Sequence, residues 1–166
     1  MKKKLVIFTD LDGTLLDDNY SFDKAKEALE VLKRLDIPIV ICTSKTRAEI
    51  EVYRKRLGNK HPFISENGGG VFIPVGYFDG DVKSRRKSKE KYSVIKLGED
   101  YDKLVRALNK INEKIGVRGF SDMSVRDLVK DSGLSLSEAK LAKKREYGEA
   151  FKLLKKNDER GLIKLI

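Results

Sequence analysis

The sequence predicts an α/β fold built on a parallel β-sheet, and three observations support this prediction. Short apolar runs of strand length alternate with stretches whose apolar residues recur at helical spacing. Polar or glycine-rich segments directly follow the first three apolar runs. The spacing between these runs leaves room for one helix in each connection, which is the pattern of right-handed βαβ units.

The expected elements of the first half follow from local patterns. The strands are 5–9, 39–42 and 62–65, and the intervening helices are 23–35 and 46–57. The strand at 5–9 is expected to be fully buried, since its run is apolar throughout up to Thr9. Thr46 and Glu49 have the spacing of a capping box, and Gly58 is a plausible end for the second helix. The apolar stripe of the first helix comprises Ala25, Ala28, Leu29, Leu32 and Leu35.

The pattern changes after residue 70. The expected order is a strand at 71–75, a basic loop at 76–91, a strand at 92–97, a helix at 101–115, a loop or short strand at 117–123, helices at 124–130 and 135–145, a strand at 151–154, and a last helix from 157 or 158. Ser135 and Glu138 have capping-box spacing. We therefore expect a core at residues 1–69 and an α+β cap at residues 70–166 that closes over it.

Composition limits the class of protein. The chain has 166 residues, 40% of them hydrophobic and 37% charged, and a net charge of +10, which suits anionic partners in general. Its single Cys excludes an internal disulfide, and abundant Lys and Glu are typical of heat-adapted proteins. No apolar run has the length of a membrane span or the pattern of a signal peptide. We expect a cytoplasmic protein without a membrane partner.

Two aspartates follow the first strand. Asp10 and Asp12 are two residues apart, so in extended chain both carboxylates point the same way. Two adjacent carboxylates repel unless a cation lies between them, and hard oxygen ligands favour Mg²⁺. Asp10 can attack an electrophile as a nucleophile, and Asp12 can donate and accept a proton. Gly13 allows the sharp turn that brings backbone amides near an anion.

Hydroxyl and cationic residues follow the second strand, next to the first in a parallel sheet. Thr43 and Ser44 can bind a phosphoryl oxygen at the start of a helix. The alternative is capping of that helix by Ser44 or Thr46, and the two roles are compatible. Lys45 and Arg47 can meet an anionic substrate, or simply face solvent at the helix start.

The string at residues 6–16, Val-Ile-Phe-Thr-Asp-Leu-Asp-Gly-Thr-Leu-Leu, resembles the first motif of the haloacid dehalogenase superfamily of phosphotransferases. The resemblance implies a Rossmann-like core. It makes Asp10 the residue that forms an aspartyl-phosphate and Asp12 the general acid and base. Mg²⁺ would be held by the Asp10 carboxylate and the Asp12 backbone carbonyl. Thr43 would be the second-motif hydroxyl, and Asn67-Gly68 matches the signature between core and a large α+β cap.

Three further strings resemble segments of the mannosyl-3-phosphoglycerate phosphatase family. They lie at 43–47 (Thr-Ser-Lys-Thr-Arg), 119–123 (Gly-Phe-Ser-Asp-Met) and 139–147 (Ala-Lys-Leu-Ala-Lys-Lys-Arg-Glu-Tyr). The resemblance to this family covers nearly the whole chain. That family hydrolyses 2-O-mannosyl-3-phosphoglycerate to mannosylglycerate, so the resemblance implies an anionic phosphorylated sugar-acid substrate. The cap residues expected to contact the substrate are Arg118, Ser121, Asp122 and Met123.

Two parts of the superfamily pattern have no match. These are a lysine that neutralises the phosphoryl intermediate and a late acidic pair that completes the metal site. Candidates by residue type are Lys152, Lys155, Lys156, Lys164, Asp158 and Glu159. The last apolar helix has no cap or polar tail, so we expect a chain that is incomplete, with reduced Mg²⁺ affinity and turnover.

Other functions stay open. A related sugar phosphatase or a phosphomannomutase would share the core and differ in the cap. A protein of a different class, binding anions or nucleic acid on a broken phosphatase core, would show salt-dependent nucleic-acid binding without turnover. Nucleic acid is not the expected partner, because the basic run at 85–91 contains no aromatic residue to stack on bases. A homodimer is compatible with the sequence.

Overall fold

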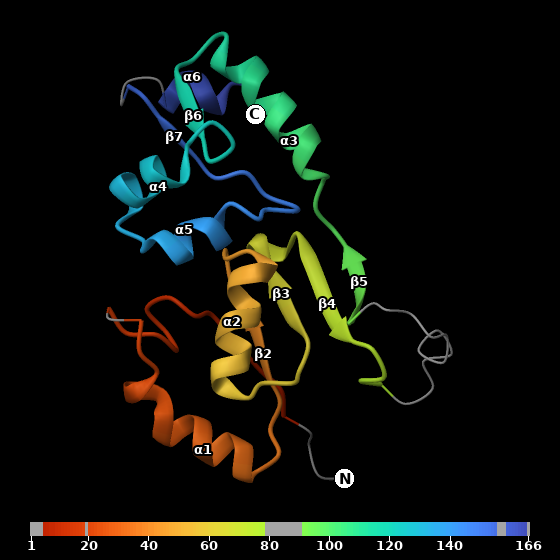
Figure 1. Ribbon diagram of the computed structural model, residues 1–166. Coiled ribbons are helices and arrows are strands. Elements are labelled where there is room, and N and C mark those ends of the chain that lie inside the picture. The colour runs from red at the N-terminus through yellow and green to blue at the C-terminus, as the bar shows by residue number, and fades with distance from the viewer. Residues whose placement is uncertain (1–4, 19, 79–90, 156–158, 166) are drawn as a thin grey trace. The chain divides into compact units, whose positions relative to one another are not determined.

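The computed structural model describes residues 5–18, 20–78, 91–155 and 159–165. Its contacts divide the chain into two units (Figure 1). Unit 1 comprises Met1–Lys45 and Ile50–Leu97, and unit 2 comprises Thr46–Glu49 and Gly98–Ile166. Most of unit 1 therefore precedes unit 2 in the chain, and one helical turn of the first half groups with the second.

A mixed five-stranded sheet forms the centre of unit 1. Its strands lie side by side in chain order: β1 (Ile7–Thr9), β2 (Ile39–Cys42), β3 (Phe63–Ser65), β4 (Gly70–Pro74) and β5 (Tyr92–Lys96). The first three strands pair in parallel, as predicted, and the last two pair antiparallel. The predicted α/β fold with a parallel sheet is confirmed for this part of the chain.

Helices connect the parallel strands. The turn η1 (Asp23–Ala25) and helix α1 (Lys26–Arg34) lie between β1 and β2, and α2 (Arg47–Leu57) lies between β2 and β3. The predicted capping box is present at the start of α2, because the Thr46 amide donates to Glu49 Oε2 at 2.9 Å and the Glu49 amide donates to Thr46 Oγ1 at 3.3 Å. Gly58 follows α2 with a φ of +61°, a conformation that glycine adopts without strain.

One face of the sheet carries the core of unit 1. Ile41 and Phe63 are 0% exposed, and they are opposite each other in the β2–β3 pairing. The Phe63 ring stacks on Phe72 with centroids 4.9 Å apart. The Arg54 guanidinium of α2 lies 4.6 Å from the Phe63 ring centre, so α2 covers this face of the sheet.

The opposite face is more open. Phe8 of β1 is 64% exposed and Ile95 of β5 is 48% exposed. The prediction that residues 5–9 are fully buried is therefore wrong. An apolar strand has two faces, and β1 lies at the edge of the sheet with one paired neighbour in the described part of the chain.

Unit 2 is a small α+β unit. Its elements are α3 (Tyr101–Asn112), β6 (Val117–Gly119), α4 (Val125–Ser132), α5 (Leu136–Ala142), β7 (Phe151–Leu153) and α6 (Glu159–Ile163). The strands β6 and β7 form a two-stranded antiparallel sheet. Two apolar clusters stabilise the unit, one around Leu108 and Val117 and the other around Met123 and Leu128.

Capping boxes begin two helices of unit 2. The predicted box of Ser135 and Glu138 is confirmed at α5. A second box, formed by Ser124 and Asp127, begins α4. It escaped prediction because Asp stands where Glu or Gln is the usual partner.

The strands β4 and β5, assigned from the sequence to the cap, extend the sheet of unit 1. By contacts, the main division falls between residues 97 and 98 rather than between 69 and 70. A functional division into core and cap stays a prediction. Residues 79–90 of the predicted basic loop lie outside the described residues. No helix that the structure describes is long and apolar enough to cross a membrane.

Candidate active site

The first part of the candidate site follows β1. Leu11 is 0% exposed and anchors the turn, while Asp10 and Asp12 on either side of it are exposed. The Leu11 amide donates to Asp10 Oδ1 at 2.6 Å, and the Leu16 amide donates to the Leu11 carbonyl at 2.7 Å. Gly13 has a φ of +66°, so the turn uses the backbone freedom predicted for it. Both predicted aspartates are thus held on a compact turn with accessible carboxylates.

The carboxyl end of β2 lies beside that of β1, at the same end of the sheet. Thr9 and Ile41 are paired in register, so the residues that follow each strand emerge side by side. Thr43 is 3% exposed, and its amide donates to the Ile64 carbonyl at 3.2 Å. Ser44 is exposed. The predicted second-motif hydroxyl therefore lies at the carboxyl ends of the parallel strands, where Asp10 also lies.

Lys45 joins these two strand ends. Its Nζ lies 2.9 Å from Asp12 Oδ2, and its side chain is 9% exposed whereas that of Asp12 is 46% exposed. The sequence predicted Lys45 as a contact for the substrate anion. The structure brings its ammonium to a predicted catalytic carboxylate, and the contact with a substrate anion stays a prediction.

The end of β3 reaches the same place through its backbone. The Asn67 amide donates to the Thr43 carbonyl at 3.1 Å, and the Glu66 amide donates to the Lys45 carbonyl at 3.0 Å. Glu66, Asn67 and Gly68 have φ values of +50°, +56° and +97°. Two successive non-glycine residues in this conformation are strained, and such strain is concentrated at functional sites. Asn67 is exposed, so its side chain is accessible.

Arg47 has a defined partner within unit 2. Its Nε and Nη2 donate to Glu146 Oε1 at 2.9 and 2.6 Å. The predicted role of Arg47 as a substrate contact stays a prediction. Glu146 itself was not singled out from the sequence, although it lies within the quoted string 139–147.

The predicted cap residues of unit 2 are largely engaged with their own unit. Arg118 pairs with Asp127 at 2.8 Å, and Asp122 Oδ2 accepts from the Gly119 amide at 3.2 Å. The Met123 side chain is 2% exposed and packs in the cluster around Leu128. The Met123 side chain is therefore buried away from a ligand, and its amide is also engaged, since it donates to the Phe120 carbonyl at 3.3 Å.

Two residues that sequence reasoning missed hold this loop. Glu149 Oε1 accepts from both the amide and the hydroxyl of Ser121, each at 2.8 Å. Lys143 Nζ donates to the Phe120 carbonyl at 2.8 Å and also to the Met123 carbonyl. The sequence contained a signal for both residues. Lys143 lies in the string 139–147 and Glu149 follows it closely, and that string resembles the same family as the string 119–123.

The donor set for a metal is small. The described residues contain no group of three or more His, Cys, Asp or Glu side chains suited to a metal. Asp10 and Asp12 nevertheless fit Mg²⁺, because their accessible oxygens are hard ligands and this ion often binds to one or two carboxylates while retaining waters. Of the lysines considered for the unmatched third motif, Lys152 pairs with Asp131. Lys156 and Asp158 lie outside the described residues.

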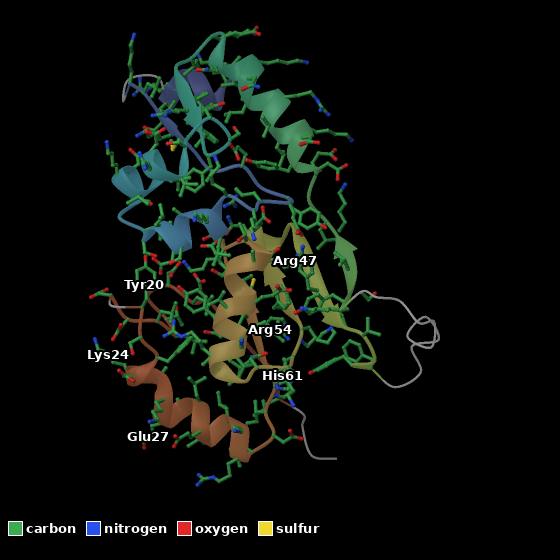
Figure 2. All side chains as sticks on the ribbon, viewed as in Figure 1. Tyr20, Lys24, Glu27, Arg47, Arg54 and His61 are labelled. Carbon is green, nitrogen blue, oxygen red and sulfur yellow. The ribbon has the colours of Figure 1, made fainter. Side chains whose placement is uncertain are left out.

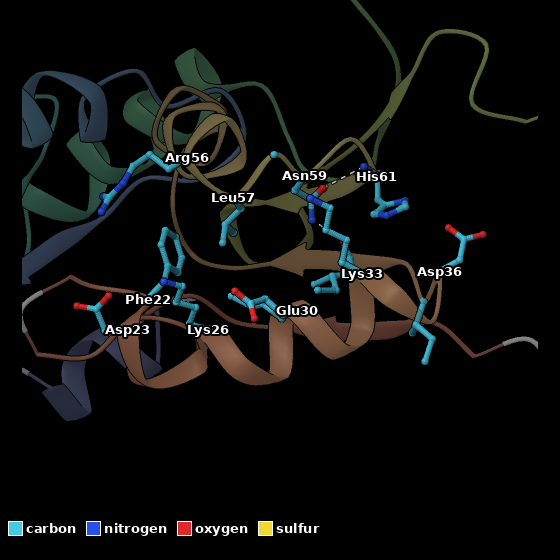
Figure 3. Close-up of a pocket in the computed structure, with 14 residues that line it drawn as sticks. Phe22, Asp23, Lys26, Glu30, Lys33, Asp36, Arg56, Leu57, Asn59 and His61 are labelled. Atoms are coloured by element: carbon cyan, nitrogen blue, oxygen red, sulfur yellow. Dashed lines mark hydrogen bonds between the residues drawn. The ribbon is translucent and has the colours of Figure 1, made fainter.

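A separate pocket of about 430 Å³ lies at the other end of the strands (Figure 3). It is lined by α1, by the end of α2 and by residues just before β3, including His61. The His61 Nδ1 lies 2.8 Å from the Tyr77 hydroxyl. Burial lowers the pKa of His61, and nearby Arg54 adds to this while Asp36 opposes it. None of the predicted site residues lines this pocket.

Comparison with solved structures defines the class of fold. A structure from Thermoplasma acidophilum matches 96% of this chain and 55% of its own, with a TM-score of 0.62 and 16% identity. A sugar phosphatase described as belonging to subclass IIB of the haloacid dehalogenase superfamily matches 86% of this chain and 56% of its own, with a TM-score of 0.51 and 20% identity. The predicted haloacid dehalogenase-like α/β fold is therefore confirmed.

Sequence comparison points to particular relatives. Residues 7–76 match the family described as haloacid dehalogenase-like hydrolase. The chain is 48% identical, over 98% of its length, to a glucosyl-3-phosphoglycerate/mannosyl-3-phosphoglycerate phosphatase of Methanococcoides burtonii. It is 41% identical, over 88% of its length, to a mannosyl-3-phosphoglycerate phosphatase of Pyrococcus horikoshii. The resemblance predicted from the sequence is confirmed.

The chain spans 60% and 59% of the length of these two relatives. Phosphatases of the haloacid dehalogenase superfamily generally use a divalent metal ion.

Proposed function

We propose that this chain carries the nucleophile, the general acid and base, and the cap of a phosphatase acting on 2-O-mannosyl-3-phosphoglycerate, which releases mannosylglycerate and phosphate. The observation that carries the proposal is that Asp10 and Asp12 follow β1 and Thr43 follows β2, at the carboxyl ends of two paired strands, with the Lys45 ammonium 2.9 Å from Asp12. The names of the relatives support the substrate class and extend it to the glucosyl analogue.

The reaction proceeds in two steps. A carboxylate oxygen of Asp10 attacks phosphorus in line, the bond from phosphorus to the ester oxygen breaks, and Asp12 gives its proton to the departing alkoxide. Asp12 then takes a proton from water as that water attacks the aspartyl-phosphate, which releases phosphate and restores the Asp10 carboxylate. The Thr43 hydroxyl donates to a non-bridging phosphoryl oxygen, where negative charge must be stabilised.

A divalent cation, which we propose is Mg²⁺, supplies positive charge to the phosphoryl oxygens when it is bound. The Asp10 carboxylate and the Asp12 backbone carbonyl would hold it. In unit 2, we propose that Arg118, Ser121 and Asp122 take part in selecting the sugar-acid portion of the substrate. The cytoplasmic location, the homodimer and the exclusion of nucleic acid as a partner stay predictions.

The test is phosphate release from 2-O-mannosyl-3-phosphoglycerate with Mg²⁺, comparing the 166-residue chain with Asp10→Asn. We expect release from the parent chain and a loss of at least about 10³-fold in the variant, because an amide is a far weaker nucleophile than a carboxylate. Asp18→Asn is the matched control, since Asp18 is an exposed aspartate outside the site. We expect this substitution to leave turnover unchanged.

Three outcomes would contradict the proposal. Equal release from the parent chain and Asp10→Asn would exclude Asp10 as the nucleophile. Release from another sugar phosphate at a higher kcat/KM would indicate that the chain belongs to a different sugar phosphatase of the superfamily. No release from any of them, together with salt-dependent binding of nucleic acid, would favour an anion-binding protein on the same fold.

A further inference from the structure

Lys45 is a buried lysine with a carboxylate partner near the surface. Its side chain is 9% exposed, whereas the Asp12 side chain that it contacts is 46% exposed. A buried ammonium loses its hydration and is stable only when charge and hydrogen bonds compensate for that loss. The Asp12 carboxylate, 2.9 Å away, supplies part of this compensation.

Two aromatic rings supply more of it. The Lys45 Nζ lies 5.5 Å from the Tyr20 ring centre and 5.8 Å from the Tyr53 ring centre. Both distances are within the range in which the face of an aromatic ring attracts a cation. Tyr53 is 6% exposed and belongs to α2, while Tyr20 lies on the segment between β1 and α1 (Figure 2).

The burial of Lys45 indicates which residue of the Lys45–Asp12 pair orients the other. Lys45 begins the β2–α2 connection, and its carbonyl also accepts from the Glu66 amide at 3.0 Å. The lysine is thus confined by three strand ends and two rings, whereas Asp12 is half exposed on a turn. In such a pair the confined residue determines the orientation of the exposed one.

We propose that Lys45 is a positioning residue for Asp12. It holds Oδ2 of Asp12, which leaves Oδ1 to exchange the proton with the leaving alcohol and then with water. This inference rests on the proposed function and deepens it, because it assigns Lys45 to the acid–base step instead of to the substrate anion. Proton transfer by a positioned side chain contributes about 10²–10⁴-fold to a rate, and that contribution depends on hydrogen-bonding geometry.

A double-mutant cycle of Lys45→Met and Asp12→Asn tests the proposal by phosphate release. We expect Lys45→Met to lower kcat about 10- to 100-fold, with KM changed less than about twofold. In the Asp12→Asn background the same substitution should change kcat less than about threefold, because two residues that act through one contact are not additive. Lys45→Arg keeps the charge and should restore part of kcat.

Lys55→Met is the matched control, since Lys55 is an exposed lysine of α2. Urea denaturation of each variant establishes that it is folded. A rise in KM with kcat unchanged would overturn the proposal in favour of direct substrate binding. An equal loss of kcat in both backgrounds would also overturn it, because Lys45 would then act independently of Asp12.

An NMR measurement of lysine ammonium groups separates this inference from the proposed function. A buried, ion-paired ammonium exchanges its hydrogens slowly with water, so Lys45 should give an observable ¹H–¹⁵N signal that Lys45→Arg removes. We expect Asp12→Asn to broaden or shift this signal strongly and Asp18→Asn to leave it unchanged. If the parent chain releases no phosphate, the proposed function fails, and this measurement alone decides the positioning. A signal unaffected by Asp12→Asn would overturn it.

Discussion

The strand-end site of unit 1 (Asp10, Asp12, Thr43 and Lys45) and the 119–123 loop of unit 2 contain similar residue types that are used differently. In the strand-end site both aspartates are exposed, and the cation beside Asp12 is buried. In the loop, the Ser121 hydroxyl is bonded to Glu149, Asp122 accepts from the Gly119 amide, and Met123 is buried. The exposed aspartates can act on a substrate at the reacting centre, whereas Ser121 and Asp122 also hold the loop in place, beside the substrate selection that we propose for them.

Deleting one hydroxyl in each region should show the largest contrast. Thr43→Val keeps the side-chain shape and should lower turnover about 100-fold, because it removes a donor to the phosphoryl group. Ser121→Ala should change kcat little, but it should cost about 1 kcal/mol of stability through the lost hydrogen bond to Glu149. Phosphate release and urea denaturation measure the two effects. If Ser121→Ala lowers kcat as much as Thr43→Val does, the contrast fails.

A methyl group added in the loop should be the next largest effect. A Cβ on Gly119 would lie 2.4 Å from Glu149 Oε1 and 2.6 Å from Leu108 Cδ2. Gly119→Ala should therefore destabilise the chain by about 1–3 kcal/mol, measured by urea denaturation. Gly116→Ala is the matched control, because its Cβ would meet Leu154 at an ordinary 3.5 Å. Equal stability of the two variants would show that the loop is looser than the structure indicates.

Removing the cap of α4 should have a smaller effect. Ser124 accepts from the Asp127 amide at 3.1 Å, and Ser124→Ala should cost about 1 kcal/mol of stability. Ser93→Ala on the exposed surface of β5 serves as the control and should be neutral. An unchanged urea midpoint for Ser124→Ala would show that this capping box does not stabilise unit 2.

Acid should weaken the two units in different pH ranges, with the smallest effects of all. Burial lowers the pKa of His61 from 6.5, and hydrogen bonds from Ser124 lower the pKa of Asp127 from 3.8. When the folded pKa is depressed, the stabilisation is present above the unfolded value and is lost as the pH falls through the folded value. His61→Gln should therefore flatten the stability profile below pH 6.5, and Asp127→Asn should flatten it below pH 3.8.

Urea denaturation over a pH series measures both profiles. If one variant flattened the stability profile in both pH ranges, His61 and Asp127 would not be separate sources of the acid sensitivity. Tyr77, which contacts His61, has its pKa raised by burial, so it stays neutral through both ranges and does not interfere with the comparison.

Local patterns were sufficient to predict most elements. The strand at 39–42 and the helix ending at residue 57 agree with β2 and α2 in their bounds. The capping boxes at Thr46 and Ser135 were predictable because they depend on residues three apart. The exposure of Phe8 was not predictable, because a local pattern does not show what lies against each face of a strand.

The sequence by itself determined the identity and spacing of Asp10 and Asp12, since the strand and the turn that present them are formed by neighbouring residues. Only the tertiary structure decided the partners of the charged groups. Lys45 and Asp12 are 33 positions apart, and Arg47 and Glu146 are 99 apart. Ion pairs between distant residues depend on how strands and loops meet in space, which residue spacing along the chain does not encode.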